Sequence, residues 1–224
     1  MIVLSLDTTM CGVEAWLGKI EHESKCGNKC DVKDKKILCK TAFSPHVEDV
    51  IDKFIFDILT ESGILLPDLV IINRGPGSFT STRVGISFVN GWFQGSAEKF
   101  KVLGICGLKA VGEYIRNTNL GKRNFIIGQE ERGERFWIIK CEGYVFSDIY
   151  VLDSYKICTL KDDTDLFLRK RVDQSKIVFV DKNGAEISDL SLTYACALIG
   201  YKRFIGGKIS NILKIVPIYS GKTS

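Results

Sequence analysis

The feature that most constrains the fold is a short apolar run, residues 69–73 (LVIIN), which leads directly into a glycine-rich turn. A run of this kind is typical of a strand in the middle of a sheet, covered on both faces. The turn spans residues 74–85 (RGPGSFTSTRVG), and its second half can begin a helix. The segment therefore predicts a strand–turn–helix unit inside an α/β domain.

The segments on either side of this unit predict further strands and helices, whose order along the chain is typical of a known fold. Strands are predicted at 1–6, 12–18, 36–43 and 101–106, and helices at 45–62 and 107–117. Ser44 is expected to cap the first helix, with Pro45 at its first helical position and Gly63 at its end. Three meandering strands followed by helix-linked strands are the layout of the ribonuclease H-like fold, the building block of the actin-like ATPases.

The second half of the chain is less regular. Strands are predicted at 124–129, 135–142, 144–151 and 176–180, and a helix at 189–203 with Asp189 as its cap. The expected fold class is α/β, with two subdomains built on mixed sheets. The N-terminal subdomain is placed at 1–110, and a smaller, divergent one at 111–224.

Composition indicates an ordinary globular protein. The chain has 224 residues, of which 45% are apolar, and its net charge of +4 is too small to establish nucleic-acid binding. The N-terminus lacks the features of a signal peptide, and no apolar run is long enough to cross a bilayer. A cytoplasmic location is expected, and in a reducing cytosol the cysteines in apolar runs should be buried: Cys39, Cys106, Cys141, Cys158 and Cys196.

His22, Cys26, Cys30 and Cys39 form a loose H-x3-C-x3-C-x8-C pattern in a charged segment. Structural zinc sites usually use tighter C-x2-C pairs, so the favoured interpretation is a polar loop between two strands. A zinc-binding nucleic-acid module stays open as an alternative. No metal is expected elsewhere, because the two histidines form no H-x3-H pair.

The glycine-rich turn is not a Walker loop, because no lysine follows its glycines. A weaker anion site remains an expectation at the helix start, with Gly77, Ser78 and Arg83 as candidate contacts. Asp7, Thr8 and Thr9 at the end of the first strand are the other candidates for phosphate. The second half lacks the facing D-x-G-G-G-T loop that nucleotide binding requires, so no catalytic residue and no cofactor are predicted.

The helix after the turn carries an unusual strip of small residues. Ser87, Gly91 and Gly95 recur every four positions, beside a bulky stripe of Val84, Phe88 and Trp92. Glycine costs about 1 kcal/mol in a helix interior, so the strip indicates close packing of another helix. That helix is either the chain's own segment 45–62 or one from a partner protein.

Four segments, LSLDTT, SPHVE, ESGI and NRGPGSFTSTRVGI, resemble in their order the TsaB (YeaZ-type) family of tRNA threonylcarbamoyladenosine biosynthesis proteins. The resemblance covers about residues 1–110. The matching turn residues are Arg74, Gly75, Pro76, Gly77, Ser78, Phe79, Thr80, Arg83 and Gly85. Ser81 and Thr82 depart from the motif, while Gln129 and Glu131 replace the Asp and Arg of a second family segment. Pro217 and Tyr219 resemble the family's C-terminal P-x-Y.

The resemblance implies two actin-like (Gcp-like) subdomains, the second degenerate, and a non-catalytic role. A TsaD-type paralogue would carry out transfer to tRNA, and the chain would bind it, or a second copy of itself, through helices of the first subdomain. A small TsaE-type ATPase would join the complex, with tRNA an indirect partner. A nucleotide-dependent phosphotransferase of actin-like fold stays open as an alternative.

Overall fold

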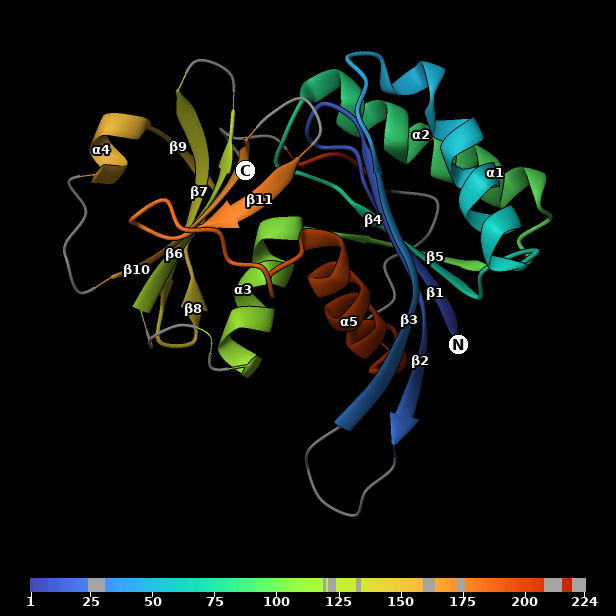
Figure 1. Ribbon diagram of the computed structural model, residues 1–224. Coiled ribbons are helices and arrows are strands. Elements are labelled where there is room, and N and C mark those ends of the chain that lie inside the picture. Colours follow the sequence, from blue (N-terminus) through green and yellow to red (C-terminus); the bar gives the residue numbers. More distant parts are fainter. Residues whose placement is uncertain are drawn as a thin grey trace.

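The computed structural model describes residues 1–23, 31–118, 120, 124–131, 134–158, 164–172, 176–207 and 215–218. They form two sheets that lie side by side with helices between them (Figure 1). The first sheet has the strand order β3-β2-β1-β4-β5. Its strands are β1 (Ile2–Asp7), β2 (Val13–Glu23), β3 (Asp31–Ala42), β4 (Leu69–Asn73) and β5 (Lys101–Ile105).

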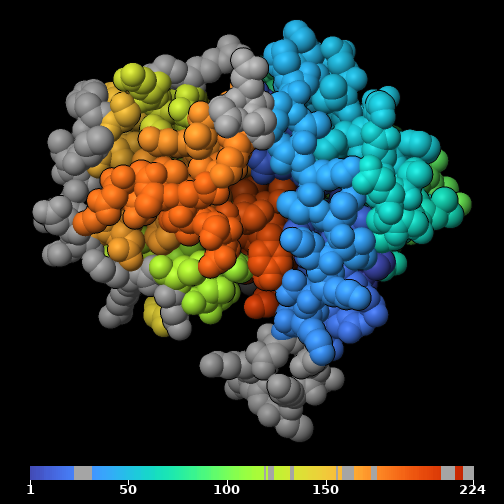
Figure 2. All heavy atoms as spheres, in the orientation of Figure 1, coloured from blue at the N-terminus to red at the C-terminus, as the bar shows by residue number. Residues whose placement is uncertain are grey.

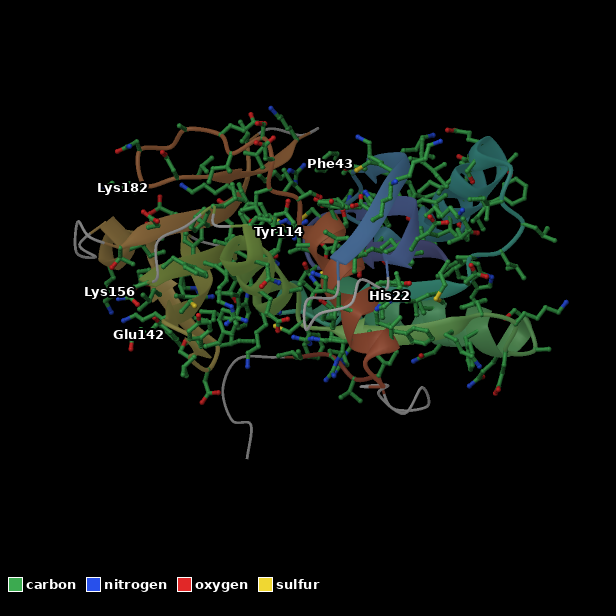
Figure 3. The ribbon with its side chains drawn as sticks, turned by 90° about the horizontal axis from the view of Figure 1, so that it is seen from below. His22, Phe43, Tyr114, Glu142, Lys156 and Lys182 are labelled. Atoms are coloured by element: carbon green, nitrogen blue, oxygen red, sulfur yellow. The ribbon has the colours of Figure 1, made fainter. Side chains whose placement is uncertain are left out.

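The pairing in the first sheet matches the order expected from the sequence. β1, β2 and β3 pair antiparallel, whereas β4 is parallel to both β1 and β5. All of β4 is buried, as its apolar sequence predicts. β2 and β3 extend well beyond β1, with His22 near one end of this hairpin and Phe43 just past the other (Figure 3).

Helices cover both faces of the first sheet. α1 (Ile51–Ser62), a short 3-10 helix η1 (Val47–Asp49) and α2 (Phe79–Gly95) pack on Leu4, Leu6 and Val70. α3 (Gly107–Thr118) and α5 (Leu192–Ile205) cover the opposite face, on Val3 and Ile71. Alternate residues of the central strands therefore serve two different core clusters.

The start of α1 differs from the prediction. The Ser44 hydroxyl donates to the His46 carbonyl and accepts from the His46 N–H, which makes a local turn instead of a helix cap. α1 begins only at Ile51, and no side chain caps it. The prediction for its end is confirmed, since Gly63 adopts a left-handed conformation with φ of 68° and its N–H bonds Leu59 and Thr60.

The second sheet has the order β11-β10-β6-β7-β8, with β9 also paired to β7. Its strands are β6 (Asn124–Glu130), β7 (Arg135–Glu142), β8 (Val145–Phe146), β9 (Tyr150–Asp153), β10 (Asp165–Arg171) and β11 (Ile177–Val180), and α4 (Ser154–Cys158) follows β9. The single strand predicted at 144–151 is instead two short ones, and β10 was not predicted. β10 is parallel to β6, so this sheet is also mixed.

α5 follows the second sheet in the chain but packs on the first. The Trp16 and Tyr194 rings lie 5.5 Å apart, and Gly200 lies against Ile71. Ser191, and not the predicted Asp189, caps this helix, because its hydroxyl accepts the Tyr194 N–H.

Figures 2 and 3 show α5 and the Tyr114 region of α3 between the two sheets, so one apolar core joins the two sheets. The subdomain boundary at residue 110 stays a prediction.

Candidate functional site at the junction of the sheets

The loop after β1 is held tightly to the glycine-rich turn. The backbone N–H and the hydroxyl of Thr9 both donate to Asp7 Oδ1, at 3.1 and 2.7 Å. The Thr9 carbonyl in turn accepts the N–H of Ser78, at 2.8 Å. Asp7, Thr8 and Thr9 are therefore buried, with exposed fractions of 2%, 0% and 2%.

Close contact with this loop explains two glycines of the turn motif. A Cβ on Gly77 would lie 2.3 Å from the Thr9 Cβ, and one on Gly85 would lie 2.2 Å from the Thr8 Oγ1. Neither position can accept a side chain without moving the loop. The motif thus places the start of α2 directly on the end of β1.

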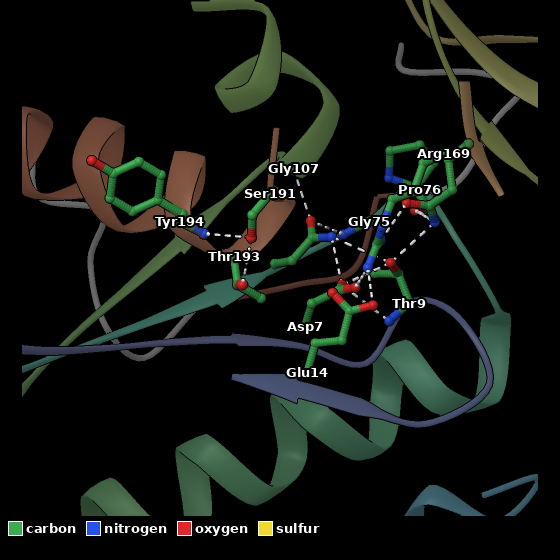
Figure 4. Close-up of polar contacts among 12 residues, drawn as sticks. Asp7, Thr9, Glu14, Gly75, Pro76, Gly107, Arg169, Ser191, Thr193 and Tyr194 are labelled. Atoms are coloured by element: carbon green, nitrogen blue, oxygen red, sulfur yellow. Dashed lines mark hydrogen bonds and ion pairs between the residues drawn. The ribbon is translucent and has the colours of Figure 1, made fainter. Parts of the chain in front are cut away.

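An arginine from the second sheet reaches into this loop. Arg169 on β10 places Nη2 2.7 Å from Asp7 Oδ2 and 2.7 Å from Glu14 Oε1, with its side chain 2% exposed (Figure 4). Its Nη1 donates to the Gln129 Oε1 at 2.8 Å. One guanidinium therefore joins β1, β2 and β6 across the junction of the sheets.

Amide side chains complete the network. Gln129 donates through Nε2 to the Thr9 hydroxyl and the Pro76 carbonyl, both at 3.0 Å. Asn73 Nδ2 donates to Asp7 Oδ1 at 2.7 Å, and its Oδ1 accepts the N–H groups of Gly75 and Gly107. Both carboxylate oxygens of Asp7 are thus hydrogen-bonded, whereas Glu14 Oε1 lies in an ion pair with Arg169 but accepts no hydrogen bond from the described residues.

The environment shifts the pKa values of Asp7, Glu14 and Arg169 in different directions. Burial would raise the pKa of Asp7, but Arg169 and the bonds from Thr9 and Asn73 more than offset it and hold that pKa below 3.8. Burial raises the pKa of Glu14 above 4.5, and Arg169 offsets this only in part. Burial would lower the pKa of Arg169, but the two carboxylates outweigh it and raise that pKa, so the guanidinium is charged.

The structure separates the residues that the sequence suggested for anion binding. Both carboxylate oxygens of Asp7 bind protein groups, while Gly77 and Ser78 lie at the start of α2. Arg83 is on the outer side of that helix, with its guanidinium 3.7 Å from the centre of the Phe79 ring. Thr9, Gly77 and Ser78 line one cavity, whereas Asp7 is bonded to Arg169 and Arg83 lies outside that cavity. Sequence reasoning missed Arg169, because it missed the strand that carries it, and it did not single out Glu14 or Asn73.

The candidate partner residues lie together on α2, on the side away from the sheet. Ser87, Gly91 and Gly95 are exposed, and Val84, Phe88 and Trp92 beside them are half-buried. A Cβ on Gly91 or Gly95 would have nothing within 4 Å. The chain's own α1 therefore does not pack against the two glycines of this strip, which leaves it open to another helix. We call these six residues the open face of α2.

Next to the open face, a groove of about 460 Å³ lies between α2 and the start of α1. Its lining residues are Glu48, Ile51, Phe79, Thr80, Arg83, Val84, Ser87 and Phe88. Phe79 is 53% exposed, which is unusual for so large an apolar side chain. The groove extends the open face toward the junction of the sheets.

A second cavity, of about 650 Å³, lies at the mouth of the junction. The loop after β1, the glycine-rich turn and the start of α2 line one wall, and β7 with the ends of β6 and β10 lines the other. The lining residues are Thr9, Met10, Cys11, Gly77, Ser78, Phe79, Thr80, Glu130, Glu131, Arg135, Trp137 and Arg171. The hydrogen-bonded residues around Arg169 lie deeper, and we call this part the floor of the junction. The cavity lies above it, at the mouth of the junction.

The end of the described chain supports the turn. The Arg74 Nε donates to the Val216 carbonyl at 2.7 Å, and the Ile218 N–H donates to the Arg74 carbonyl at 2.7 Å. Pro217 lies between these contacts, whereas Tyr219 lies outside the described residues. Arg74 therefore joins the turn to a segment more than a hundred positions later.

The cysteine predictions have mixed outcomes. Cys106, Cys141 and Cys196 are buried as expected, but Cys39 on the edge strand β3 is exposed, and the side chain of Cys158 lies outside the described part. Cys26 and Cys30 of the loose zinc pattern also lie outside it. Within the described residues, no group of three His, Cys, Asp or Glu side chains could hold a metal ion. Likewise, no helix there is long and apolar enough to span a membrane.

No protein-family model matches the sequence. The tRNA threonylcarbamoyladenosine biosynthesis protein TsaB of Escherichia coli (strain K12) is 27% identical over 141 residues, which cover 61% of this chain and 54% of that protein. The matched region thus spans about half the length of this curated relative.

The similarity to solved structures extends over nearly the whole chain. YeaZ from Pseudomonas aeruginosa superposes with a TM-score of 0.63 and 17% identity, covering 97% of this chain and 99% of that one. A second structure, described as an uncharacterized protein with similarity to peptidase YeaZ from Pseudomonas aeruginosa, superposes with a TM-score of 0.61 and 17% identity. The match covers 97% of this chain and 98% of that one. The expected α/β fold with two mixed sheets is therefore confirmed.

Proposed function

The chain is a TsaB/YeaZ-type protein, and from this premise we propose that it acts in tRNA threonylcarbamoyladenosine biosynthesis. Its role is that of a non-catalytic scaffold and activator. It binds a TsaD-type catalytic paralogue through the first subdomain, and a small TsaE-type ATPase joins the assembly. The observation that carries the proposal is the open face of α2.

The filled floor of the junction supports a non-catalytic role. Asp7, at the strand end where an actin-like ATPase would hold phosphate or its metal, is bonded instead to Arg169. A nucleotide entering there would have to displace a buried ion pair and leave charges unpaired, which costs several kcal/mol. This geometry favours a binding protein over the alternative, a nucleotide-dependent phosphotransferase.

The open face has the properties of a helix-packing surface. Exposed glycines allow a partner backbone to approach closely, and the half-buried Phe88 and Trp92 beside them supply apolar area. In an isolated chain such a helix is costly, because each glycine destabilises it by about 1 kcal/mol. A partner that uses the strip would account for that cost.

The experiment is co-purification with the TsaD-type paralogue from the same genome. Gly91→Leu should abolish the complex by filling the strip, while the variant stays folded, because a Cβ at this position meets nothing. Asn117→Leu on the exposed side of α3 is the matched control and should bind as the wild type does. Undiminished capture of the paralogue by Gly91→Leu would refute the proposed surface.

Two further measurements separate the alternatives. Size-exclusion chromatography with light scattering tests whether two copies pair through the same face, since Gly91→Leu should also abolish such a homodimer. The isolated chain should neither hydrolyse ATP nor modify tRNA. Turnover by the pure chain that is lost in Asp7→Ala would sink the non-catalytic role and favour the phosphotransferase.

A further inference from the structure

Gln129 on β6 is a fully buried amide that connects the second sheet to the turn before α2. Its Oε1 accepts a hydrogen bond from Arg169 Nη1 at 2.8 Å, and its Nε2 donates to the Thr9 hydroxyl and the Pro76 carbonyl, both at 3.0 Å. A guanidinium can only donate and a carbonyl can only accept, so these two neighbours fix the orientation of the amide. Arg169 therefore holds Gln129 in the orientation that binds the turn.

The contacts of Gln129 hold the turn on both sides of Gly77. The Pro76 carbonyl is bonded to Gln129 directly. The Ser78 N–H donates to the carbonyl of Thr9, and the hydroxyl of Thr9 accepts from Gln129. Gly77 itself lies against Thr9, since a Cβ there would come 2.3 Å from the Thr9 Cβ. The last three residues before α2 are thus fixed by contacts that lead back to the second sheet.

α2 lacks a cap of its own at the point where this turn ends. Ser78 occupies the cap position of the helix, but its side chain makes no capping hydrogen bond, and its hydroxyl donates to the Ser81 hydroxyl at 3.1 Å. The first turn of a helix has backbone N–H groups without partners inside the helix, and without a side-chain cap that turn is less stable. The position of the first turn of α2 therefore depends on the residues that precede it.

The first turn of α2 forms one end of the surface proposed for the partner. Phe79 and Thr80 line the groove between α2 and the start of α1, and Phe79 is 53% exposed. Val84, Ser87 and Phe88 of the open face line the same groove, so the groove and the open face are one continuous surface. A shift of the first turn would move the exposed Phe79 ring relative to the rest of this surface.

This inference rests on the proposed function, because it concerns the surface that binds the TsaD-type paralogue. We propose that Gln129 is a positioning residue for that binding. Gln129 is 0% exposed and cannot itself touch a partner. It acts by holding the first turn of α2, and with it Phe79, in the arrangement that the paralogue recognises. The second sheet thus contributes to partner binding without lying at the partner surface.

The test measures the dissociation constant of the complex with the paralogue by calorimetry, using the full chain. Gln129→Met keeps the length of the side chain but removes its donor and its acceptor. We expect this variant to raise the dissociation constant by about tenfold, which corresponds to the net contribution of one or two hydrogen bonds. Val178→Ala is the matched control, because Val178 is buried in a core cluster of the second sheet that contains no residue of the first. It should destabilise the fold but leave the dissociation constant unchanged.

Amide hydrogen exchange of the isolated chain reports on the start of α2 without the partner. In Gln129→Met the N–H of Ser78, which donates to the Thr9 carbonyl, should exchange about tenfold faster than in the wild type. Val178→Ala should leave this rate unchanged. Equal acceleration in the two variants would mean that Gln129 only stabilises the fold, and the positioning role would be overturned.

The binding measurements separate two kinds of failure. If the wild type binds the paralogue, Gly91→Leu does not, and Gln129→Met binds as the wild type does, the proposed surface stands and the positioning role of Gln129 is overturned. If the wild type itself does not bind, the proposed function fails and the positioning role fails with it. Gln129→Asn keeps the amide but is one methylene shorter, and it carries both measurements if Gln129→Met does not fold.

Discussion

Arg169 and Asp7 come from different sheets, 162 positions apart in the chain, and their side chains lie 2.7 Å apart. Both side chains are 2% exposed, so neither charge can be solvated if the other is lost. Glu14 shares the same Nη2 atom of Arg169. The stability of this junction therefore depends on one guanidinium that serves two carboxylates.

Arg169→Met should be among the most destabilising substitutions on the second sheet. It leaves Asp7 and Glu14 buried without a cation, and the loss of one partner from a buried pair costs about 3–5 kcal/mol. Urea unfolding followed by circular dichroism measures this change in the free energy of unfolding. Lys176→Met is the matched control. It removes an exposed ion pair with Glu186 and should cost less than about 1 kcal/mol. Equal losses in the two variants would contradict the role given to Arg169.

Asp7 should make the fold sensitive to acid. The pKa of Asp7 in the folded chain lies below the ordinary value of 3.8. The ionised carboxylate therefore stabilises the fold at pH values above 3.8, and this contribution is lost as the pH falls below 3.8 and through the folded pKa. Asp7→Asn should therefore be about 3 kcal/mol less stable than the wild type at neutral pH. The difference should narrow below pH 3.8, as unfolding experiments in a series of buffers can test. A difference that stays constant with pH would rule out this linkage.

Glu14 should behave in the opposite way. Its pKa in the folded chain lies above the ordinary 4.5, so its contribution is fully present below 4.5 and is lost as the pH rises through the folded value. Glu14→Gln, which mimics the neutral acid, should be at least as stable as the wild type at neutral pH. The same unfolding series should show this advantage disappearing below pH 4.5. A variant clearly less stable than the wild type at neutral pH would refute the prediction.

The sequence predicts the first sheet well because its signals are local. The apolar run Leu69–Asn73 and the periodic apolar residues of α1 need no knowledge of distant contacts to be recognised. The end of α1 at Gly63 follows in the same way from the special conformation that glycine allows. The predicted beginning of α1 was wrong, because the Ser44 side chain can bond the backbone of its own neighbours as easily as it can cap a helix.

The floor of the junction could not be predicted in this way. β10 has the sequence DLFLRKR, in which three consecutive basic residues conceal the strand pattern. Arg169 is buried because distant carboxylates neutralise it, and no local rule brings an arginine on β10 to an aspartate on β1. Sequence reasoning identified Asp7 but could not identify its partner.

The cap of α5 offers a direct test of one corrected prediction. Ser191 accepts the Tyr194 N–H through its hydroxyl, so Ser191→Ala should lower the free energy of unfolding by about 1 kcal/mol. Asp189→Ala removes the cap predicted from sequence and should change it by less than about 0.5 kcal/mol. Urea unfolding of the two variants under identical conditions distinguishes the positions. A larger loss for Asp189→Ala than for Ser191→Ala would restore the original assignment.

Two glycines of the same helix, α2, should respond oppositely to alanine. At Gly85 the new Cβ would lie 2.2 Å from the Thr8 Oγ1, so the β1 loop must move, which costs about 1–3 kcal/mol. At Gly91 the Cβ meets nothing, and alanine should stabilise the helix by up to about 1 kcal/mol. Thermal unfolding of Gly85→Ala and Gly91→Ala measures both effects on one helix. Destabilisation by Gly91→Ala in the isolated monomer would mean that the strip packs within the chain. That result would contradict the proposal that the open face binds a partner.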